Sequence, residues 1–154
     1  MEIIYKKGDL LECEESWILH GCNAQGKMGS GVAKLIRDKY PTAHMVYMYQ
    51  YDNEEMKLGS VTYAQQDDGK TIFNGITQEF YGHQSKHAKR VYVSYKAIED
   101  VMWCIDQQAA ASESIGIRVA MPKIGAGLGG GDWDIIAEII ENNSFNFQPV
   151  VYEL

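Results

Sequence analysis

Short apolar runs alternate with amphipathic stretches along this chain, and the alternation predicts strands and helices in turn. Patterns typical of buried or half-buried strands occupy residues 2–6, 16–23, 59–65, 70–77, 115–121 and 149–154. Apolar residues spaced by three and four positions predict helices over residues 31–40, 42–50, 91–110 and 133–141. Pro41 separates the first two helices, and Asp132 is expected to be the N-cap of the last one.

Strands and helices that alternate in this way predict an α/β fold. We expect a mixed central sheet of about six strands with helices on both faces. The Asp-Asp-Gly sequence at 67–69 joins two predicted strands as a hairpin, so the sheet is not expected to be all-parallel. The 154 residues contain no internal repeat, linker or low-complexity segment, which predicts a single domain over residues 1–154.

The chain has a formal net charge of −7, with 45% hydrophobic and 23% charged residues, which is typical of a soluble, folded protein. An acidic chain lacks the basic stripe that holds a nucleic-acid backbone, so we expect no direct binding to nucleic acid. No apolar run reaches the roughly 18–20 residues of a transmembrane helix, and the first residues do not resemble a signal peptide. We therefore expect a cytoplasmic protein without a membrane partner.

The three cysteines, Cys13, Cys22 and Cys104, are odd in number and far apart in the sequence. This pattern argues against a disulfide framework and against a thiolate zinc site, and it predicts free thiols. The histidines and carboxylates form no ligand pattern such as H-E-x-x-H, so we expect no metal and no cofactor.

Two glycine-rich loops, at 26–31 and 125–131, each lie between a predicted strand and a predicted helix. Ligands of α/β sheets bind beyond the carboxyl ends of the strands, where glycine loops and helix N-termini offer backbone N–H groups to phosphates. The pair of loops therefore predicts a site in which each loop binds one side of a single diphosphate. The alternative is that the glycines only form tight turns. The first loop lacks the ending of a Walker A motif. The second matches G-x-G-x-x-G, but no acidic residue follows about 20 positions later, which disfavours a Rossmann site.

Four segments resemble the macro domain family. HGCNAQGKMGSGVAKLIRDKYP (20–41) and MPKIGAGLGGGDW (121–133) are similar to its two signature segments, KGDLLE (7–12) to its first-strand turn, and VVYEL (150–154) to its closing strand. Their order and spacing match over essentially the whole chain. The resemblance is greatest to the branch that contains the ADP-ribose-1″-phosphate phosphatases and the related deacylating and ADP-ribosyl-glutamate-hydrolysing domains. It implies a three-layer fold and ADP-ribose as the ligand.

The resemblance also implies which residues bind the ligand. Asp9, with Leu10, is expected at the adenine end, where a carboxylate can accept a hydrogen bond from the exocyclic amine; the alternative for Asp9 is a role in the turn. Residues of the two loops are expected around the diphosphate and the distal ribose, and these are Met28, Gly29, Ser30, Gly31, Val32, Ile124, Gly125, Ala126, Gly127, Leu128 and Gly129.

Three residues are candidates for catalysis near the distal ribose: His20, Asn23 and Asp132. His20 could act as a base or hold a phosphate, or it could be a structural histidine inside the strand. Asn23 could face the ribose or bind the backbone at the strand end. Asp132 could serve as a base for water, although its expected role as a helix cap is a sufficient structural reason for the residue.

The chain departs from the glutamate-linked ADP-ribose hydrolases of this branch at two positions. Those enzymes look to use a lysine after the Ile-Thr of the fourth strand and an aspartate after the Gly-Leu of the second loop. This chain has Gln78 and Gly129 at these positions. A Schiff-base mechanism is therefore disfavoured. In the polar segment 78–90, His83 or His87 could meet a terminal phosphate and Phe80 or Tyr81 could lie against the ligand; the alternative is a solvated loop.

These patterns together predict an ADP-ribose-binding macro domain that acts as a phosphatase on ADP-ribose-1″-phosphate, with water as the nucleophile. The alternatives are a hydrolase that removes an acyl or ADP-ribosyl group, and a reader of ADP-ribose without catalytic activity. We expect the partner to be ADP-ribose or ADP-ribose-1″-phosphate, and the protein to be a monomer.

Overall fold

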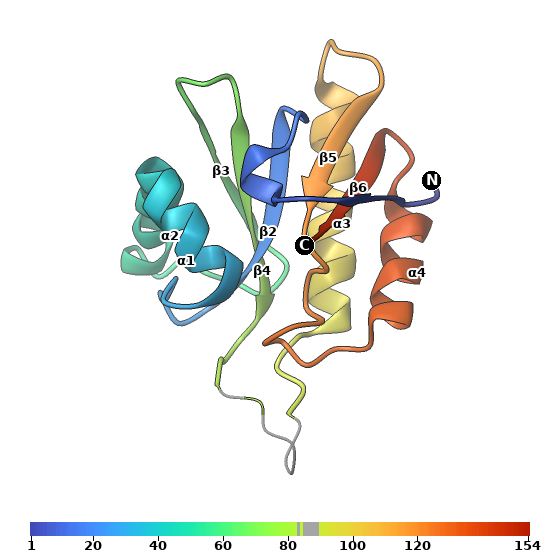
Figure 1. Cartoon of the computed structure of the whole chain (residues 1–154). Coiled ribbons are helices and arrows are strands. Elements are labelled where there is room, and N and C mark those ends of the chain that lie inside the picture. Colours follow the sequence, from blue (N-terminus) through green and yellow to red (C-terminus); the bar gives the residue numbers. More distant parts are fainter. Residues whose placement is uncertain (83, 85–89) are drawn as a thin grey trace.

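One mixed sheet organises the computed structural model, which describes residues 1–82, 84 and 90–154 (Figure 1). Within these residues it has six strands in the order β1-β6-β5-β2-β4-β3. The strands are β1 (Ile4–Lys7), β2 (Trp17–Asn23), β3 (Val61–Gln65), β4 (Thr71–Gln78), β5 (Ile117–Met121) and β6 (Phe147–Glu153). Only β3 is antiparallel to its neighbour, because it forms a hairpin with β4, and the predicted mixed sheet is therefore confirmed.

Helices cover both faces of this sheet, which confirms the predicted three-layer α/β fold (Figure 1). The helices are the 3₁₀ helix η1 (Leu10–Glu12) and the α-helices α1 (Gly31–Lys39), α2 (Pro41–Asp52), α3 (Tyr95–Ala111) and α4 (Trp133–Asn143). Neighbouring strand residues face opposite layers. Leu19 accordingly packs in the core under α3 and α4, whereas Ile18 packs in the core under α1 and α2.

Of the element boundaries that differ from the sequence prediction, two have identifiable reasons. Helix α3 begins at Tyr95 and not at residue 91, because the Ser94 side chain caps it by accepting a hydrogen bond from Ala97 N, while Val93 forms a bridge with Gln78. Strand β6 begins at Phe147, two residues before the predicted start. The ring of Pro149 does not break it, since only its N–H is missing from the ladder.

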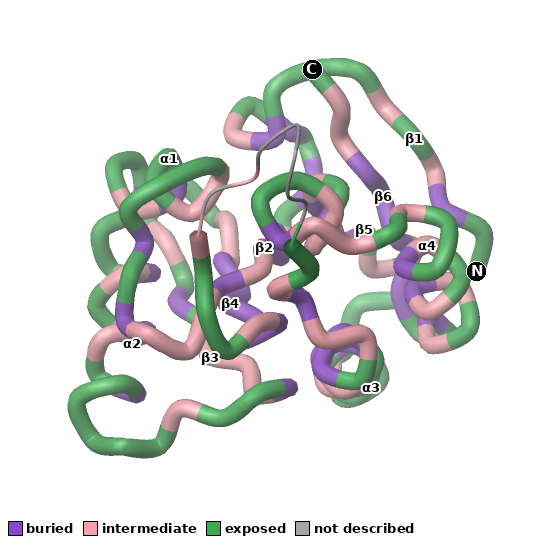
Figure 2. The backbone as a smooth tube through the Cα atoms, turned by 90° about the horizontal axis from the view of Figure 1, so that it is seen from below, coloured by how far each residue is buried: buried purple, intermediate pink, exposed green. Residues whose placement is uncertain are grey.

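Strands β1, β6, β5, β2 and β4 are parallel to one another, so their carboxyl ends lie on the same side of the sheet, and β4 runs to the lower end of the molecule in Figure 1. Figure 2 views the molecule from this side, with α1 and α2 on one side of the strands and α3 and α4 on the other. Both glycine-rich loops start at this edge, since β2 leads into residues 24–30 and β5 into residues 122–132. No helix in the described parts of the chain is long and apolar enough to cross a membrane.

Candidate functional site

A cleft of about 310 Å³ opens where β2, β4 and β5 end. The first turn of α1 forms one wall and the loop after β5 forms the other. Thr77, Gln78, Tyr81 and Gly82 lie at the β4 end. Nine residues predicted from the sequence line the cleft: Asn23, Ser30, Gly31, Val32, Ile124, Gly125, Gly127, Leu128 and Gly129. The two loops predicted to face one ligand therefore do face one cavity.

The first wall presents an uncapped helix N-terminus. Ser30 is the N-cap residue of α1, but its side chain makes no capping hydrogen bond. Among the described residues, no acceptor is found for the backbone N–H groups of Gly31, Val32 and Ala33, and all three residues line the cleft. Free N–H groups and the positive end of the helix dipole favour an anion at this position.

The second wall is a glycine loop held by its own backbone. Gly131 N donates to Gly125 O (2.7 Å) and Gly130 N to Gly127 O (3.1 Å), and Gly125 has a φ of +77°, which favours glycine. A Cβ at Gly129 would lie 2.7 Å from Gly125 O, whereas a Cβ at Gly127 would meet open space. The close approach of Gly125 O thus requires a glycine at position 129. At Gly127 the absence of a side chain keeps the cleft open.

The loop between β2 and α1 is organised by Asn23 and the buried Tyr47. Asn23 Oδ1 accepts a hydrogen bond from Gln25 N (2.9 Å) and lies 3.0 Å from the Tyr47 hydroxyl oxygen, and Asn23 Nδ2 donates to Lys27 O (2.8 Å). Lys27 N in turn donates to the Tyr47 hydroxyl (3.1 Å). Asn23 therefore lines the cleft and also makes hydrogen bonds to the backbone at the strand end, the alternative role given to it above.

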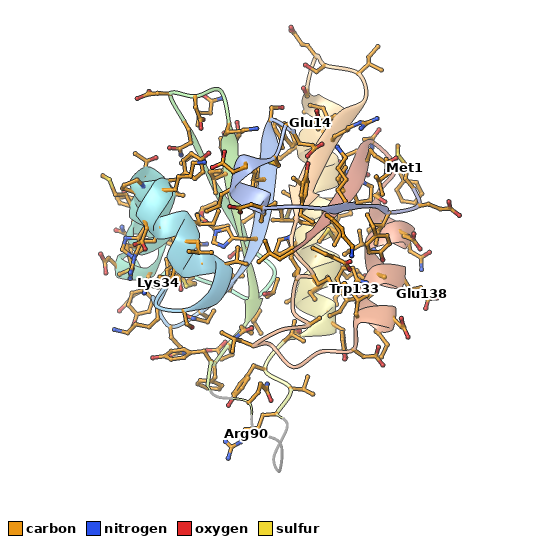
Figure 3. All side chains as sticks on the ribbon, viewed as in Figure 1. Met1, Glu14, Lys34, Arg90, Trp133 and Glu138 are labelled. Atoms are coloured by element: carbon orange, nitrogen blue, oxygen red, sulfur yellow. The ribbon has the colours of Figure 1, made fainter. Side chains whose placement is uncertain are left out.

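The charged side chains that line the cleft are Lys27 and Lys123, and no carboxylate is among the described lining residues. Lys123 forms an ion pair with Glu153 (2.7 Å) and lies 5.8 Å from the ring centroid of Trp133, at the start of α4 (Figure 3). Although the whole chain has a net charge of −7, the cleft lining therefore favours anions.

Several predicted ligand residues do not line the cleft, for reasons of packing. Leu10 is buried against Ile36 under α1 and α2, and Met28 packs with Cys22 and Tyr47. The side chain of Asp9 is exposed and caps η1, where it accepts a hydrogen bond from Leu11 N (2.9 Å).

Two further small residues of the loops also lie outside the cleft lining. Gly29 is exposed, and a Cβ there would meet no other atom within 4 Å. Ala126 packs against the core under α3 and α4. Both are nevertheless next to a lining residue in the sequence, Gly29 to Ser30 and Ala126 to Gly127.

His20, the first catalytic candidate, is fully buried and does not line the cleft. Its Nε2 lies 2.6 Å from Asn74 Oδ1, while Asn74 Nδ2 donates to Ala43 O. Burial lowers the pKa of His20 to about 4, although the hydrogen bond to Asn74 opposes this shift. This environment accounts for His20 as a structural histidine. Burial also raises the pKa of the neighbouring Cys22 thiol, which lines the cleft but stays protonated.

Acid is expected to destabilise the fold through His20. The imidazole is neutral in the folded protein down to a pKa of about 4, whereas in the unfolded chain it takes up a proton below pH 6.5. The free energy of unfolding should therefore fall between pH 6.5 and pH 4, by about 3 kcal/mol. Urea unfolding across this range would measure it. His20→Gln, which can still donate to Asn74, should lack this contribution; an identical slope in both proteins would contradict the assignment.

Asp132 is exposed and caps α4, as predicted, by accepting a hydrogen bond from Asp134 N (2.9 Å). Its own N–H donates to the Tyr95 hydroxyl (3.0 Å), and the residue does not line the cleft. The capping role therefore accounts for Asp132, and its position does not support a catalytic role in the cleft.

Other residues that line the cleft were not predicted as ligand residues, among them Thr77, Gly82 and the two lysines. Gln78, at the end of β4, also lines it, in the position where related hydrolases were expected to have a lysine. Tyr81 was one of two aromatic candidates, and it lines the cleft where Phe80 does not. His83 and His87 lie outside the described residues. The described parts of the chain contain no group of three side chains that could hold a metal ion.

Comparisons with known proteins agree on one family. A family model of the macro domain matches residues 19–140. A 17.5 kDa protein of Enterobacteria phage T4, whose function is uncharacterized, is 27% identical over 99% of this chain and 97% of its own length. An ADP-ribose 1″-phosphate phosphatase of Candida glabrata is 24% identical over 99% of this chain and 98% of the enzyme. A DNA ADP-ribosyl glycohydrolase of Mycobacterium tuberculosis is 30% identical over 88% of this chain, which spans only 37% of that enzyme.

Solved structures give the same result for the fold. A protein of unknown function from Bacteroides thetaiotaomicron superimposes with a TM-score of 0.86 and 26% identity, over 100% of this chain and 99% of that one. Thermosipho africanus DarTG, solved in complex with ADP-ribose, superimposes with a TM-score of 0.77 and 17% identity, over 97% of this chain and 41% of that one. With the family model matching most of the chain, this protein belongs to the macro domain family.

Proposed function

We propose that this protein binds ADP-ribose in the cleft and hydrolyses ADP-ribose-1″-phosphate to ADP-ribose and phosphate. The observation that carries the proposal is the polarity of the cleft. The start of α1 offers backbone N–H groups without acceptors among the described residues, the glycine loop opposite leaves open space at Gly127, and the charged residues of the lining are two lysines in an otherwise acidic chain. A diphosphate between the walls would satisfy these features.

The order of the strands suggests how the ligand would lie. Asp9 follows β1 at one side of the sheet, and Asn23 and Gln78 end β2 and β4 toward the other side. The loop after β5 lies between them, so the diphosphate would occupy the space between this loop and the start of α1. The adenine would then extend toward Asp9, and the distal ribose toward the ends of β2 and β4.

Water is the nucleophile that best fits this environment. Cys22 is the thiol that lines the cleft, and because burial raises its pKa it is a poor nucleophile. Of the three predicted catalytic residues, Asn23 is the one that lines the cleft, where its amide could orient the distal ribose. Backbone N–H groups that meet the phosphoryl oxygens, together with fixed positioning of the substrate, would supply the remaining rate enhancement.

Full-length similarity to the Candida glabrata phosphatase supports this reaction over removal of ADP-ribose from a conjugate. The glycohydrolase relative keeps the second reaction as an alternative, but Gln78 cannot form the Schiff base expected of a lysine at that position. A third candidate, a reader without activity, is favoured by one observation. No carboxylate among the described lining residues is in place to act as a general base.

The test is to incubate the protein with ADP-ribose-1″-phosphate, to follow released phosphate, and to measure ADP-ribose binding by calorimetry. We expect phosphate release with multiple turnovers and saturable binding of ADP-ribose. Binding without release above the buffer control would reject the phosphatase and favour the reader. Release of ADP-ribose from a conjugated substrate, without release of phosphate, would favour the glycohydrolase reaction. Absence of all three would reject the site.

A further inference from the structure

Lys27 is an exposed residue that lines the cleft, and hydrogen bonds to Tyr47 and Asn23 hold its backbone. Its N–H donates to the hydroxyl of Tyr47, a fully buried residue, and its carbonyl oxygen accepts a hydrogen bond from Asn23 Nδ2. Burial raises the pKa of Tyr47, so this hydroxyl remains protonated and can donate to Asn23 O (2.6 Å). The backbone at Lys27 is thus fixed from both sides, and the residue lines the cleft.

The two lysines of the cleft differ in their partners. Lys123 is neutralised by Glu153, whereas no carboxylate among the described residues forms an ion pair with Lys27. The residues that the structure does not describe, 83 and 85–89, contain no aspartate or glutamate. An ammonium group without a carboxylate partner, in the wall of a cleft that favours anions, is suited to bind a ligand anion.

Lys27 lies in the loop between the end of β2 and the start of α1. Ala24 N donates to Gln78 O (2.9 Å) and Gln25 Nε2 to Glu79 O (3.1 Å), so this part of the loop lies along the end of β4. Lys27 O accepts a hydrogen bond from Asn23 Nδ2 near this end of β4, where the proposed pose places the distal ribose. Lys123 lies after β5, toward the adenine side of the cleft.

From these contacts we propose that Lys27 binds the terminal phosphate of ADP-ribose-1″-phosphate and thereby selects a phosphomonoester on the distal ribose over a free hydroxyl. This inference rests on the proposed function of the cleft. A phosphate dianion carries more charge than any other group at that end of the ligand, so a single ammonium group should discriminate between the two ligands through charge. The discrimination should weaken as salt screens the interaction.

The experiment compares the wild type with Lys27→Met, which keeps an unbranched side chain only one atom shorter and removes its charge. Affinity for ADP-ribose is measured by calorimetry. Affinity for ADP-ribose-1″-phosphate is measured as KM where phosphate is released and as Kd where it is not. We expect Lys27→Met to weaken interaction with the phosphorylated ligand about tenfold and to change ADP-ribose binding less than about twofold, with an unchanged melting temperature.

Lys34→Met is the matched control, because Lys34 is exposed on α1 and does not line the cleft (Figure 3). It makes the same change in net charge and should affect neither ligand. An equal loss for both ligands in Lys27→Met would overturn the inference, since Lys27 would then act on the diphosphate. Unchanged affinities would overturn it as well. If the wild type binds neither ligand, the proposed function fails, and the inference fails with it.

Discussion

Gly127→Val is expected to reduce the affinity for ADP-ribose at least about 100-fold and to leave the fold intact. Gly127 lines the cleft, and a Cβ built there meets no atom within 4 Å. Its φ lies outside the left-handed region, so a branched residue is tolerated by the backbone. The valine side chain would therefore occupy the ligand's space without straining the protein. Calorimetry with ADP-ribose measures the affinity, and a melting curve checks the fold.

Gly29→Val is the matched control for this prediction. Gly29 belongs to the opposite loop, has the same open space around a Cβ and no positive φ, but does not line the cleft. We expect its affinity for ADP-ribose to stay within about threefold of the wild type. Normal binding by a well-folded Gly127→Val would reject the cleft as the ligand site. A loss in Gly29→Val as large as that in Gly127→Val would mean that the ligand extends beyond the cleft onto the exposed loop.

The elements of the fold were predictable because the sequence carries their periodicities without ambiguity. The buried run Trp17–Asn23 and the three-and-four spacing before Pro41 each gave the correct element. The start of α3 was not predictable from periodicity. Val91 and Val93 continue the apolar pattern, but a side-chain cap at Ser94 and a bridge to Gln78 start the helix later. Such boundaries depend on contacts between distant segments.

The location of the site was predictable to the level of loops but not of side chains. The two strand–glycine loop–helix units indicate where backbone N–H groups converge, and the cleft lies there. Whether a loop residue faces the cavity or the core depends on tertiary packing, and Met28 turned inward against Tyr47. His20 shows the same limit, because the Asn74 beside it is 54 positions away in the sequence.

Lys27 was missed although it lies inside the first loop. A lysine among glycines in a polar loop has no periodicity to mark it, and its significance depends on which carboxylates surround it in space. The only sequence signal was its place between Asn23 and Ser30, two residues that were themselves predicted to contact the ligand.

Asp106→Ala is expected to lower the free energy of unfolding by about 4 kcal/mol. Asp106, buried on α3, accepts hydrogen bonds through Oδ1 from Phe145 N (2.9 Å) and Asn146 N (2.7 Å), and through Oδ2 from Asn146 Nδ2 (3.1 Å). These bonds fix the connection between α4 and β6 against α3. Alanine would leave two backbone N–H groups in a partly buried position without a partner, so both the hydrogen bonds and the solvation of the donors are lost.

Two control variants identify the cause of this loss, with urea unfolding as the measurement. Asp106→Asn keeps one oxygen that can accept from both backbone N–H groups and should cost only about 1–2 kcal/mol. Gln107→Ala, at the next and exposed position of α3, should stay within about 0.5 kcal/mol of the wild type. If Asp106→Asn were as damaging as Asp106→Ala, the charge of the carboxylate would be the stabilising factor. If Asp106→Ala were harmless, water would have to satisfy the two N–H groups, and the connection would not depend on α3 for its conformation.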